Sequence, residues 1–123
     1  MAAWEVVLNV LTPLLEGNRE ESLAASEELM QATFRDPEGM YYLARQLGYL
    51  REEAPALNML SRAMDNGFFC HAAMLRDPWL DSLRARTEFT SLMSKVHQLQ
   101  REASATFVAG GGPSLLGINS EGY

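Results

Sequence analysis

The sequence has few of the residues that build covalent or metal-stabilised frameworks. Its 123 residues include one cysteine, Cys70, which excludes an internal disulfide and a zinc site made from several cysteines. No apolar run approaches the roughly 20 residues that span a bilayer. The N-terminal stretch MAAWEVVLNV carries an acid and lacks the basic segment of a signal peptide. We therefore expect a soluble, cytoplasmic protein.

Positive charge is also scarce. Lys and Arg number 10 against 16 Asp and Glu, which gives a formal net charge of −6. Nucleic acids and anionic membranes both attract clustered cations, so neither is expected as a partner. Residues 1–60 hold four cations and ten acids, whereas residues 61–123 hold six of each. The acids are expected on solvated helix faces; the alternative is an acidic surface that attracts a basic partner.

What the sequence does have is helical periodicity. Apolar residues make up 47% of the chain, which suits one folded domain or a part of something longer. Apolar positions recur at the i, i+3, i+4, i+7 spacing of a helix face, and no stretch alternates well enough for a strand. The predicted fold class is all-α, with about six to seven helices. These helices are expected over residues 4–15, 19–34, 37–47, 53–66, 68–75, 78–83 and 87–107.

Short motifs predict where these helices begin and end. Asp36-Pro37 and Asp77-Pro78 each place a capping acid before a proline at the first helical position. Asn18 and Thr87 are further expected caps, and Gly67 is placed to stop the fourth helix. Two further expectations concern proline and glycine. Pro13 should kink or divide the first helix, and the glycine-rich residues 108–123 should form a flexible, non-helical tail.

Residues 37–68 carry a pattern of large and small residues at helix–turn–helix spacing. The first helix holds the pair Leu43-Ala44, and the second holds the small–large–small trio Ala56, Leu60 and Ala63. Alanines let paired helices approach closely, and the large residues fill the gaps between them. This segment resembles a tetratricopeptide repeat, a helix–turn–helix unit that stacks in arrays.

The resemblance implies a short right-handed solenoid within residues 1–107. Residues 37–68 match best, residues 4–36 form a partial repeat, and residues 69–107 form a degenerate closing unit with a long final helix. In the closing unit the segment 75–84, LRDPWLDSLR, resembles the C-terminal end of such arrays in bacterial multidomain regulators. The resemblance thus implies the sensor or regulatory end of a larger protein, with Trp79 as an expected core anchor.

In proteins of this family the first helix of each pair lines a concave groove that takes a peptide or helix. Carried onto this chain, the groove positions are Glu38, Tyr41, Arg45 and Tyr49, whose spacings of three and four share one helix face. Tyr and Arg are frequent binding hot spots. In the alternative, Tyr41 and Tyr42 pack against neighbouring helices and Arg45 pairs with Glu38 or another nearby acid.

Residues that carry catalytic or metal chemistry are sparse, so we expect no catalytic site, cofactor or metal. Cys70 is expected to be buried, His97 to lie on the surface, and the pairs Glu27-Glu28 and Glu52-Glu53 to be solvated. The predicted function is a non-catalytic protein-interaction module. One alternative is self-association through uncapped apolar ends such as Trp4-Val6-Val7. A remote alternative is a small ligand-binding domain or enzyme centred on Cys70 and His71.

Overall fold

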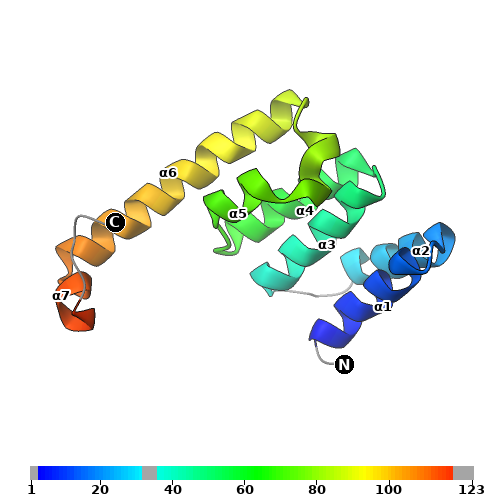
Figure 1. The fold of residues 1–123 in the computed structure, drawn as a ribbon, viewed down its shortest axis with the longest axis horizontal. Coiled ribbons are helices and arrows are strands. Elements are labelled where there is room, and N and C mark those ends of the chain that lie inside the picture. The colour runs from blue at the N-terminus through cyan, green and yellow to red at the C-terminus, as the bar shows by residue number, and fades with distance from the viewer. Residues whose placement is uncertain (1–2, 32–35, 118–123) are drawn as a thin grey trace.

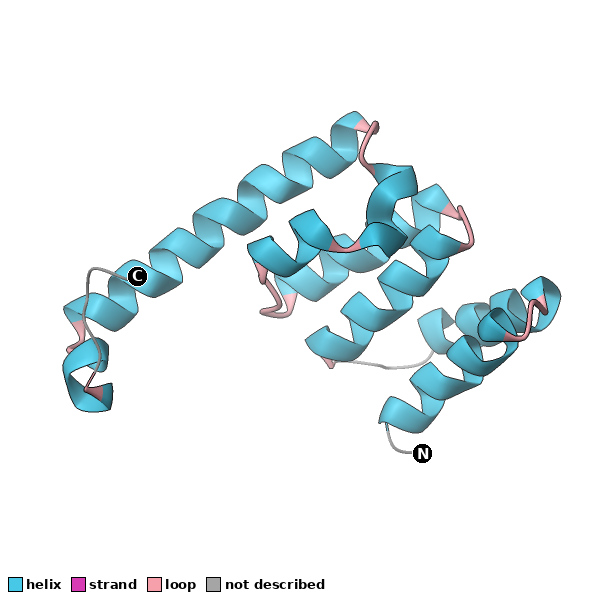
Figure 2. Ribbon diagram, in the orientation of Figure 1, coloured by secondary structure: helices cyan, strands magenta, loops and turns pink. Residues whose placement is uncertain are grey.

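The computed structural model describes residues 3–31 and 36–117. Within these ranges every regular element is a helix and none is a strand, so the all-α prediction is confirmed (Figure 2). The elements are α1 (Ala3–Leu15), α2 (Arg19–Gln31), α3 (Pro37–Tyr49), α4 (Glu53–Asp65), α5 (His71–Arg76), the 3₁₀ helix η1 (Pro78–Leu83), α6 (Thr87–Ala109) and α7 (Gly112–Leu116).

The helices pack as consecutive hairpins. α1 packs on α2, and α3 packs on α4. α1 also contacts α3, and α3 contacts η1, so these three elements form one continuous layer. α6 contacts α4 and α5, then extends away from the body of the molecule and carries α7 at its far end (Figure 1). The layer formed by α1, α3 and η1 is the part that positions the site described below.

The core is centred on the α3–α4 hairpin. The large and small residues singled out in the sequence meet here, and each is at most 1% exposed. They are Leu43, Ala44, Leu47, Ala56, Leu60 and Ala63. Leu80 and Leu83 of η1 are fully buried against the same cluster. Burying each leucine contributes roughly 1.5–3 kcal/mol, so this contact fixes both the hairpin and the closing turn.

α2 packs through two serines and one leucine. Ser22 and Ser26 are 0% exposed and Leu29 is 2% exposed, whereas Leu23 and Met30 are only partly buried. The Ser22 hydroxyl donates to the Val10 carbonyl at 2.9 Å, and the Ser26 hydroxyl donates to the Ser22 carbonyl at 2.8 Å. Because both hydroxyls donate to backbone carbonyls, the burial of these serines leaves neither hydroxyl without a hydrogen bond. The predicted end of this helix, residues 32–34, lies outside the described residues.

Most predicted helix starts are confirmed. The Asp36 carboxylate accepts from the Glu38 amide at 3.1 Å, and the Asp77 carboxylate accepts from the Trp79 amide at 3.0 Å. Asn18 caps α2 in the same way. Each cap satisfies an amide that has no acceptor within its helix.

Several local expectations are wrong. Of the two alternatives for Pro13, division of the first helix is wrong, because α1 runs unbroken past Pro13 to Leu15. Thr87 is the first residue of α6 rather than its cap, because Arg86 holds the N-cap position without a side-chain bond. The fifth helix begins at His71, not at residue 68.

The expectation of a non-helical tail from residue 108 is also wrong. α6 continues to Ala109, and residues 112–116 form α7. Gly112 sits so close to the Phe107 ring that an added Cβ would lie 2.1 Å from it. The glycines therefore allow α7 to fold back onto α6, a use that composition alone does not indicate. Residues 118–123 of the predicted tail lie outside the described residues.

Three helices end in the same backbone motif. After α1, α3 and α4, the chain adopts a positive φ of 78° at Gly17, 61° at Arg51 and 104° at Gly67. At the end of α3, the Arg51 amide donates to the Gly48 carbonyl and the Glu52 amide to the Leu47 carbonyl, both at 3.0 Å. This is the Schellman motif, in which glycine is usual. An arginine there costs about 1 kcal/mol in backbone conformation.

Gly48 is the point of closest approach between α3 and η1. A Cβ added to Gly48 would lie 2.7 Å from the Trp79 carbonyl oxygen. The Ser82 hydroxyl also donates to the Gly48 carbonyl at 2.8 Å. The missing side chain thus lets the closing turn lie directly on the helix.

We expect Gly48→Ala to destabilise the protein although alanine is the better helix former. Propensity would add about 1 kcal/mol, but the clash with a backbone carbonyl costs about 1–3 kcal/mol and should prevail. Urea unfolding measures the difference. Asn58→Ala, at an exposed position of α4, is the matched control and should be neutral or stabilising. Equal effects of the two substitutions would contradict the close contact.

Candidate functional site

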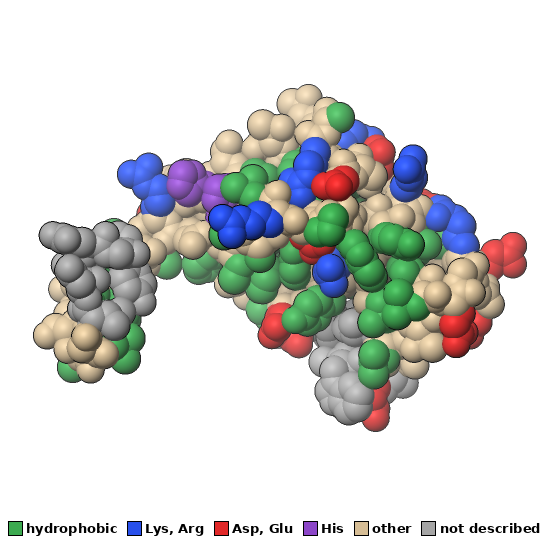
Figure 3. Space-filling view, in the orientation of Figure 1, with side chains coloured by type: hydrophobic (Ala, Val, Ile, Leu, Met, Phe, Trp, Pro, Cys, Tyr) green, Lys and Arg blue, Asp and Glu red, His purple; other side chains and the backbone are tan. Residues whose placement is uncertain are grey.

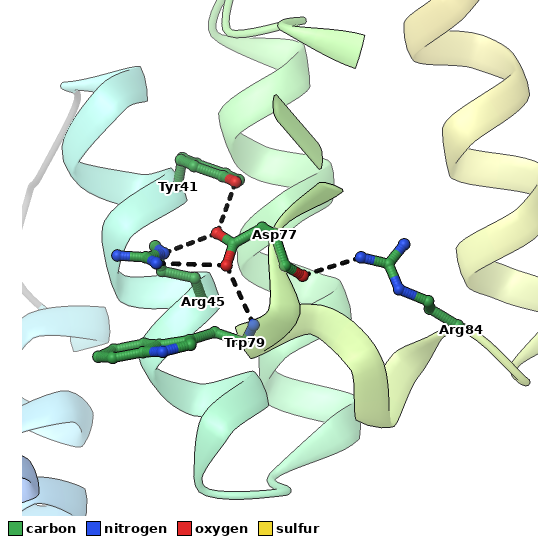
Figure 4. Close-up of polar contacts among 5 residues, drawn as sticks. All are labelled: Tyr41, Arg45, Asp77, Trp79 and Arg84. Carbon is green, nitrogen blue, oxygen red and sulfur yellow. Dashed lines mark hydrogen bonds and ion pairs between the residues drawn. The ribbon is translucent and has the colours of Figure 1, made fainter. Parts of the chain in front are cut away.

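A carboxylate at the start of η1 is held by several donors from two parts of the chain (Figure 4). The Asp77 side chain is 7% exposed. The Tyr41 hydroxyl donates to its Oδ2 at 2.8 Å. Arg45 donates from Nε to Oδ2 at 2.7 Å and from Nη2 to Oδ1 at 3.2 Å. The Trp79 amide completes the shell, and Arg84 donates to the Asp77 backbone carbonyl at 2.8 Å.

These contacts fix the protonation state of the group. Burial raises the pKa of Asp77, but the hydrogen bonds from Arg45, Tyr41 and the Trp79 amide outweigh it and hold the pKa below the ordinary 3.8. Burial, then the hydrogen bond to Asp77, raise the pKa of Tyr41 well above the ordinary 10.0. At neutral pH the pair is a carboxylate and a neutral phenol. The hydrogen bond between them joins α3 to the start of η1.

Arg45 also orders an aromatic surface. Its guanidinium carbon lies 4.4 Å from the centroid of the Trp79 ring, and the Tyr49 ring lies 4.8 Å from the same indole. Tyr49 is 54% exposed and Tyr42 is 40% exposed. We call Tyr42, Arg45, Tyr49 and Trp79 the aromatic face. Hydrophobic side chains gather around the region where α1 and α3 lie side by side (Figure 3).

The structure places the four predicted groove residues in different environments. Tyr41 is 6% exposed, and its ring stacks on that of Phe68 with the centroids 4.6 Å apart. Arg45 is half-buried against Asp77. Glu38 lies apart from them and accepts a hydrogen bond from Tyr42 at 2.9 Å. The acid that pairs with Arg45 is thus Asp77 and not Glu38. Tyr49 alone of the four is a largely exposed aromatic.

Sequence reasoning missed two members of the site. Asp77 was identified only as a helix cap, and Trp79 only as a core anchor. The cap function is real, but the second oxygen of the same carboxylate accepts from Tyr41 and Arg45. Trp79 is only partly buried. The position of Asp77 before a proline predicts a helix cap. Its spacing along the chain does not indicate which residues of another helix it contacts.

The histidines come together in a way that the sequence did not indicate. The rings of His71 and His97 stack with centroids 4.5 Å apart. Burial and then the neighbouring His97 lower the pKa of His71. His97 is exposed as predicted, whereas the prediction of a buried Cys70 is wrong, because it lies outside the helix at the N-cap of α5. Among the described residues, no group of three or more potential ligands could hold a metal ion.

The paired acids mostly lie at the surface, where several make ion pairs. Glu27 and Glu28 are exposed. Arg19 donates to Glu52 at 2.6 Å, and Arg86 donates to Glu53 at 2.8 Å. These bridges tie α2 and α6 to the turn between α3 and α4. Exposed pairs of this kind contribute only about 0–1 kcal/mol each.

No family model matches the chain, and no curated protein or solved structure matches it. Among the helices in the described parts of the chain, none is long and apolar enough to cross a membrane. The function is therefore argued from the geometry of the site.

We expect Asp77→Asn to lower the free energy of unfolding by about 2–3 kcal/mol. Asparagine keeps the size and the cap to the Trp79 amide but leaves Arg45 without its buried anion, and breaking such pairs is costly. The control is Asp81→Asn, because Asp81 pairs with Arg84 at 67% side-chain exposure. That substitution should cost less than about 0.5 kcal/mol. Urea unfolding of both variants checks the difference, and similar losses would refute a special role for Asp77.

The same pair predicts an acid-sensitive contribution to stability. Because the folded pKa of Asp77 is depressed below 3.8, its contribution is present above that value and is lost as pH falls through the folded pKa. The gap in unfolding free energy between the native chain and Asp77→Asn should be constant near neutral pH and should shrink as the pH falls below 3.8. Urea unfolding across this range measures the gap. A gap that stays constant in acid would contradict the prediction.

Proposed function

We propose that the protein is a non-catalytic interaction module that binds a partner protein on its aromatic face. The observation that carries the proposal is the exposure of Tyr49 beside a Trp79 ring that Arg45 already covers, with the exposed Tyr42 on the same helix. Exposed aromatics and arginine are the residue types that dominate binding hot spots. Because Asp77 holds Arg45 in place before any partner arrives, little side-chain entropy is lost on binding.

The proposal includes a tetratricopeptide-like arrangement of the helices. Support comes from the buried alanines between α3 and α4 and from the continuous layer of α1, α3 and η1. In this view η1 takes the place of a first helix in the closing unit, and α6 takes the place of the second. A place at the regulatory end of a larger bacterial protein is part of the same proposal, and it rests on the sequence resemblance alone.

Electrostatics suggest how such a partner is recruited. Most acids of residues 1–60 lie at exposed positions, and this half carries the whole net charge of −6. A basic surface on the partner would be attracted over distances of about 10 Å. Self-association remains the second candidate, because Leu115 and Leu116 of α7 are 84% and 65% exposed. Trp4, Val6 and Val7, which first suggested it, have side chains outside the described set.

Photo-crosslinking in cells tests the proposal. A photoreactive phenylalanine derivative in place of Tyr49 should capture a defined protein, whereas the same group in place of Ser91, exposed on α6, should not. With the captured protein in hand, Tyr49→Ala should weaken binding by about tenfold or more and Ser91→Ala should not.

The identity of the captured species separates the two candidates. A different protein supports the interaction module, and a second copy of this chain supports self-association instead. Equal capture from both positions, or an unchanged dissociation constant for Tyr49→Ala, would remove the aromatic face as the binding surface.

A further inference from the structure

A hollow of about 450 Å³ opens where the end of α3, the turn to α4 and η1 meet. Two of its walls are the aromatic side chains of Tyr49 and Trp79. Gly48 also lines it, and the close approach of that residue to the Trp79 carbonyl shapes this end of the helix. The two aromatic rings therefore give the hollow a planar, apolar surface. Its volume lies within the range of ordinary ligand sites.

One cation lines the hollow, and its placement is unusual. Arg51 has a φ of 61° and is, among the residues that the structure describes, the only non-glycine with a positive φ. Gly17 and Gly67 hold the same place in the same motif at the ends of α1 and α4. The fold therefore accepts glycine at this position, and the strained arginine points to a use for its side chain.

The guanidinium of Arg51 is exposed and, within the described ranges, has no hydrogen bond or ion pair. The acids in the hollow are already engaged. Glu53 accepts from Arg86 at 2.8 Å, and Asp81 accepts from Arg84 at 2.8 Å. The unpaired charge at this place is thus positive, although the surrounding half of the chain is acidic.

The same two acids set a limit on the anion. Glu53 and Asp81 keep their negative charges beside the hollow, so a dianion such as a phosphate would be repelled more strongly than a single carboxylate. A carboxylate also matches the planar fork of an arginine, with two parallel hydrogen bonds. An apolar group beside that carboxylate would cover the exposed area of Tyr49.

We propose that this hollow binds an acidic segment of the partner protein, in which an aromatic or branched apolar residue directly precedes a carboxylate. The carboxylate pairs with Arg51, and the apolar side chain packs against Tyr49 and Trp79. The inference rests on the proposed function, because the partner supplies the segment. It adds a positive contact on the half of the chain that carries the negative net charge.

The test uses the full chain labelled with ¹⁵N and two capped tetrapeptides, acetyl-Ala-Phe-Glu-Ala-amide and acetyl-Ala-Phe-Gln-Ala-amide. The glutamate peptide should shift the Arg51 amide and the Trp79 indole signals with a dissociation constant of about 1 mM. The glutamine peptide should bind about tenfold more weakly. Acetyl-phenylalanine amide with free acetate, added together, should not reproduce the shifts. Equal binding of the two peptides, or shifts from the separate components, would overturn the proposal.

Three variants tie the result to the arginine. Arg51→Gly should abolish the preference for the glutamate peptide while it keeps or raises the urea midpoint, since glycine suits this backbone. Arg51→Lys should reduce the preference, and Arg101→Gln, at an exposed position of α6, should leave it unchanged. A lower urea midpoint for Arg51→Gly would show that the arginine serves the fold, and a retained preference would exclude it as the anion contact. Either result would overturn the proposal.

This outcome is separable from that of the proposed function. If crosslinking at Tyr49 captures a partner but neither peptide binds in the hollow, the proposed interaction surface is supported and the proposed acidic segment is refuted. If the glutamate peptide binds as expected but nothing is captured, the anion site stands and the proposed function fails.

Discussion

The arrangement of the closing turn depends on how one buried carboxylate is satisfied. Asp77 lies 36 residues from Tyr41 and 32 residues from Arg45, and its hydrogen bonds join α3 to η1 across that separation. A carboxylate removed from water is costly unless donors fill its lone pairs. Here two side chains of α3 and one backbone amide do so together. The docking of the turn on α3 and the hydrogen bonding of the carboxylate therefore depend on each other.

The geometry of the surface follows from that docking. Arg45 is held by Asp77 on one side and lies over Trp79 on the other, so the indole cannot move independently of the carboxylate. Tyr49 leans on the same indole. Arg45 and Trp79 of the aromatic face are thus connected to the buried Asp77, whereas Tyr42 and Tyr49 remain exposed beyond them.

The sequence predicted the elements well where one face of a helix is apolar. The spacing of Leu43, Leu47 and Leu60 located α3 and α4, and the capping acid Asp36 located the start of α3. The sequence did not predict the buried face of α2, where the packing uses small polar residues. Ser22 and Ser26 are typical surface residues, and their burial depends on hydrogen bonds from their hydroxyls to backbone carbonyls. The site was half predictable for a related reason. Helical spacing grouped Tyr41 with Arg45, but spacing carries no information on the carboxylate that reaches them from a distant turn.

Gly48 carries a consequence for how this chain can change over time. Its lack of a side chain is needed because the Trp79 carbonyl lies against it. Asp77 is one of the anchors that hold that carbonyl there, together with the buried leucines of η1 and the Ser82 hydroxyl. The two positions therefore form a substitution pair. A descendant that loses the acid at 77 has lost one anchor of the turn, which weakens the constraint on position 48. A descendant that first gains a side chain at 48 must displace the turn against all of its anchors. A change at position 77 is therefore expected to come before a change at position 48.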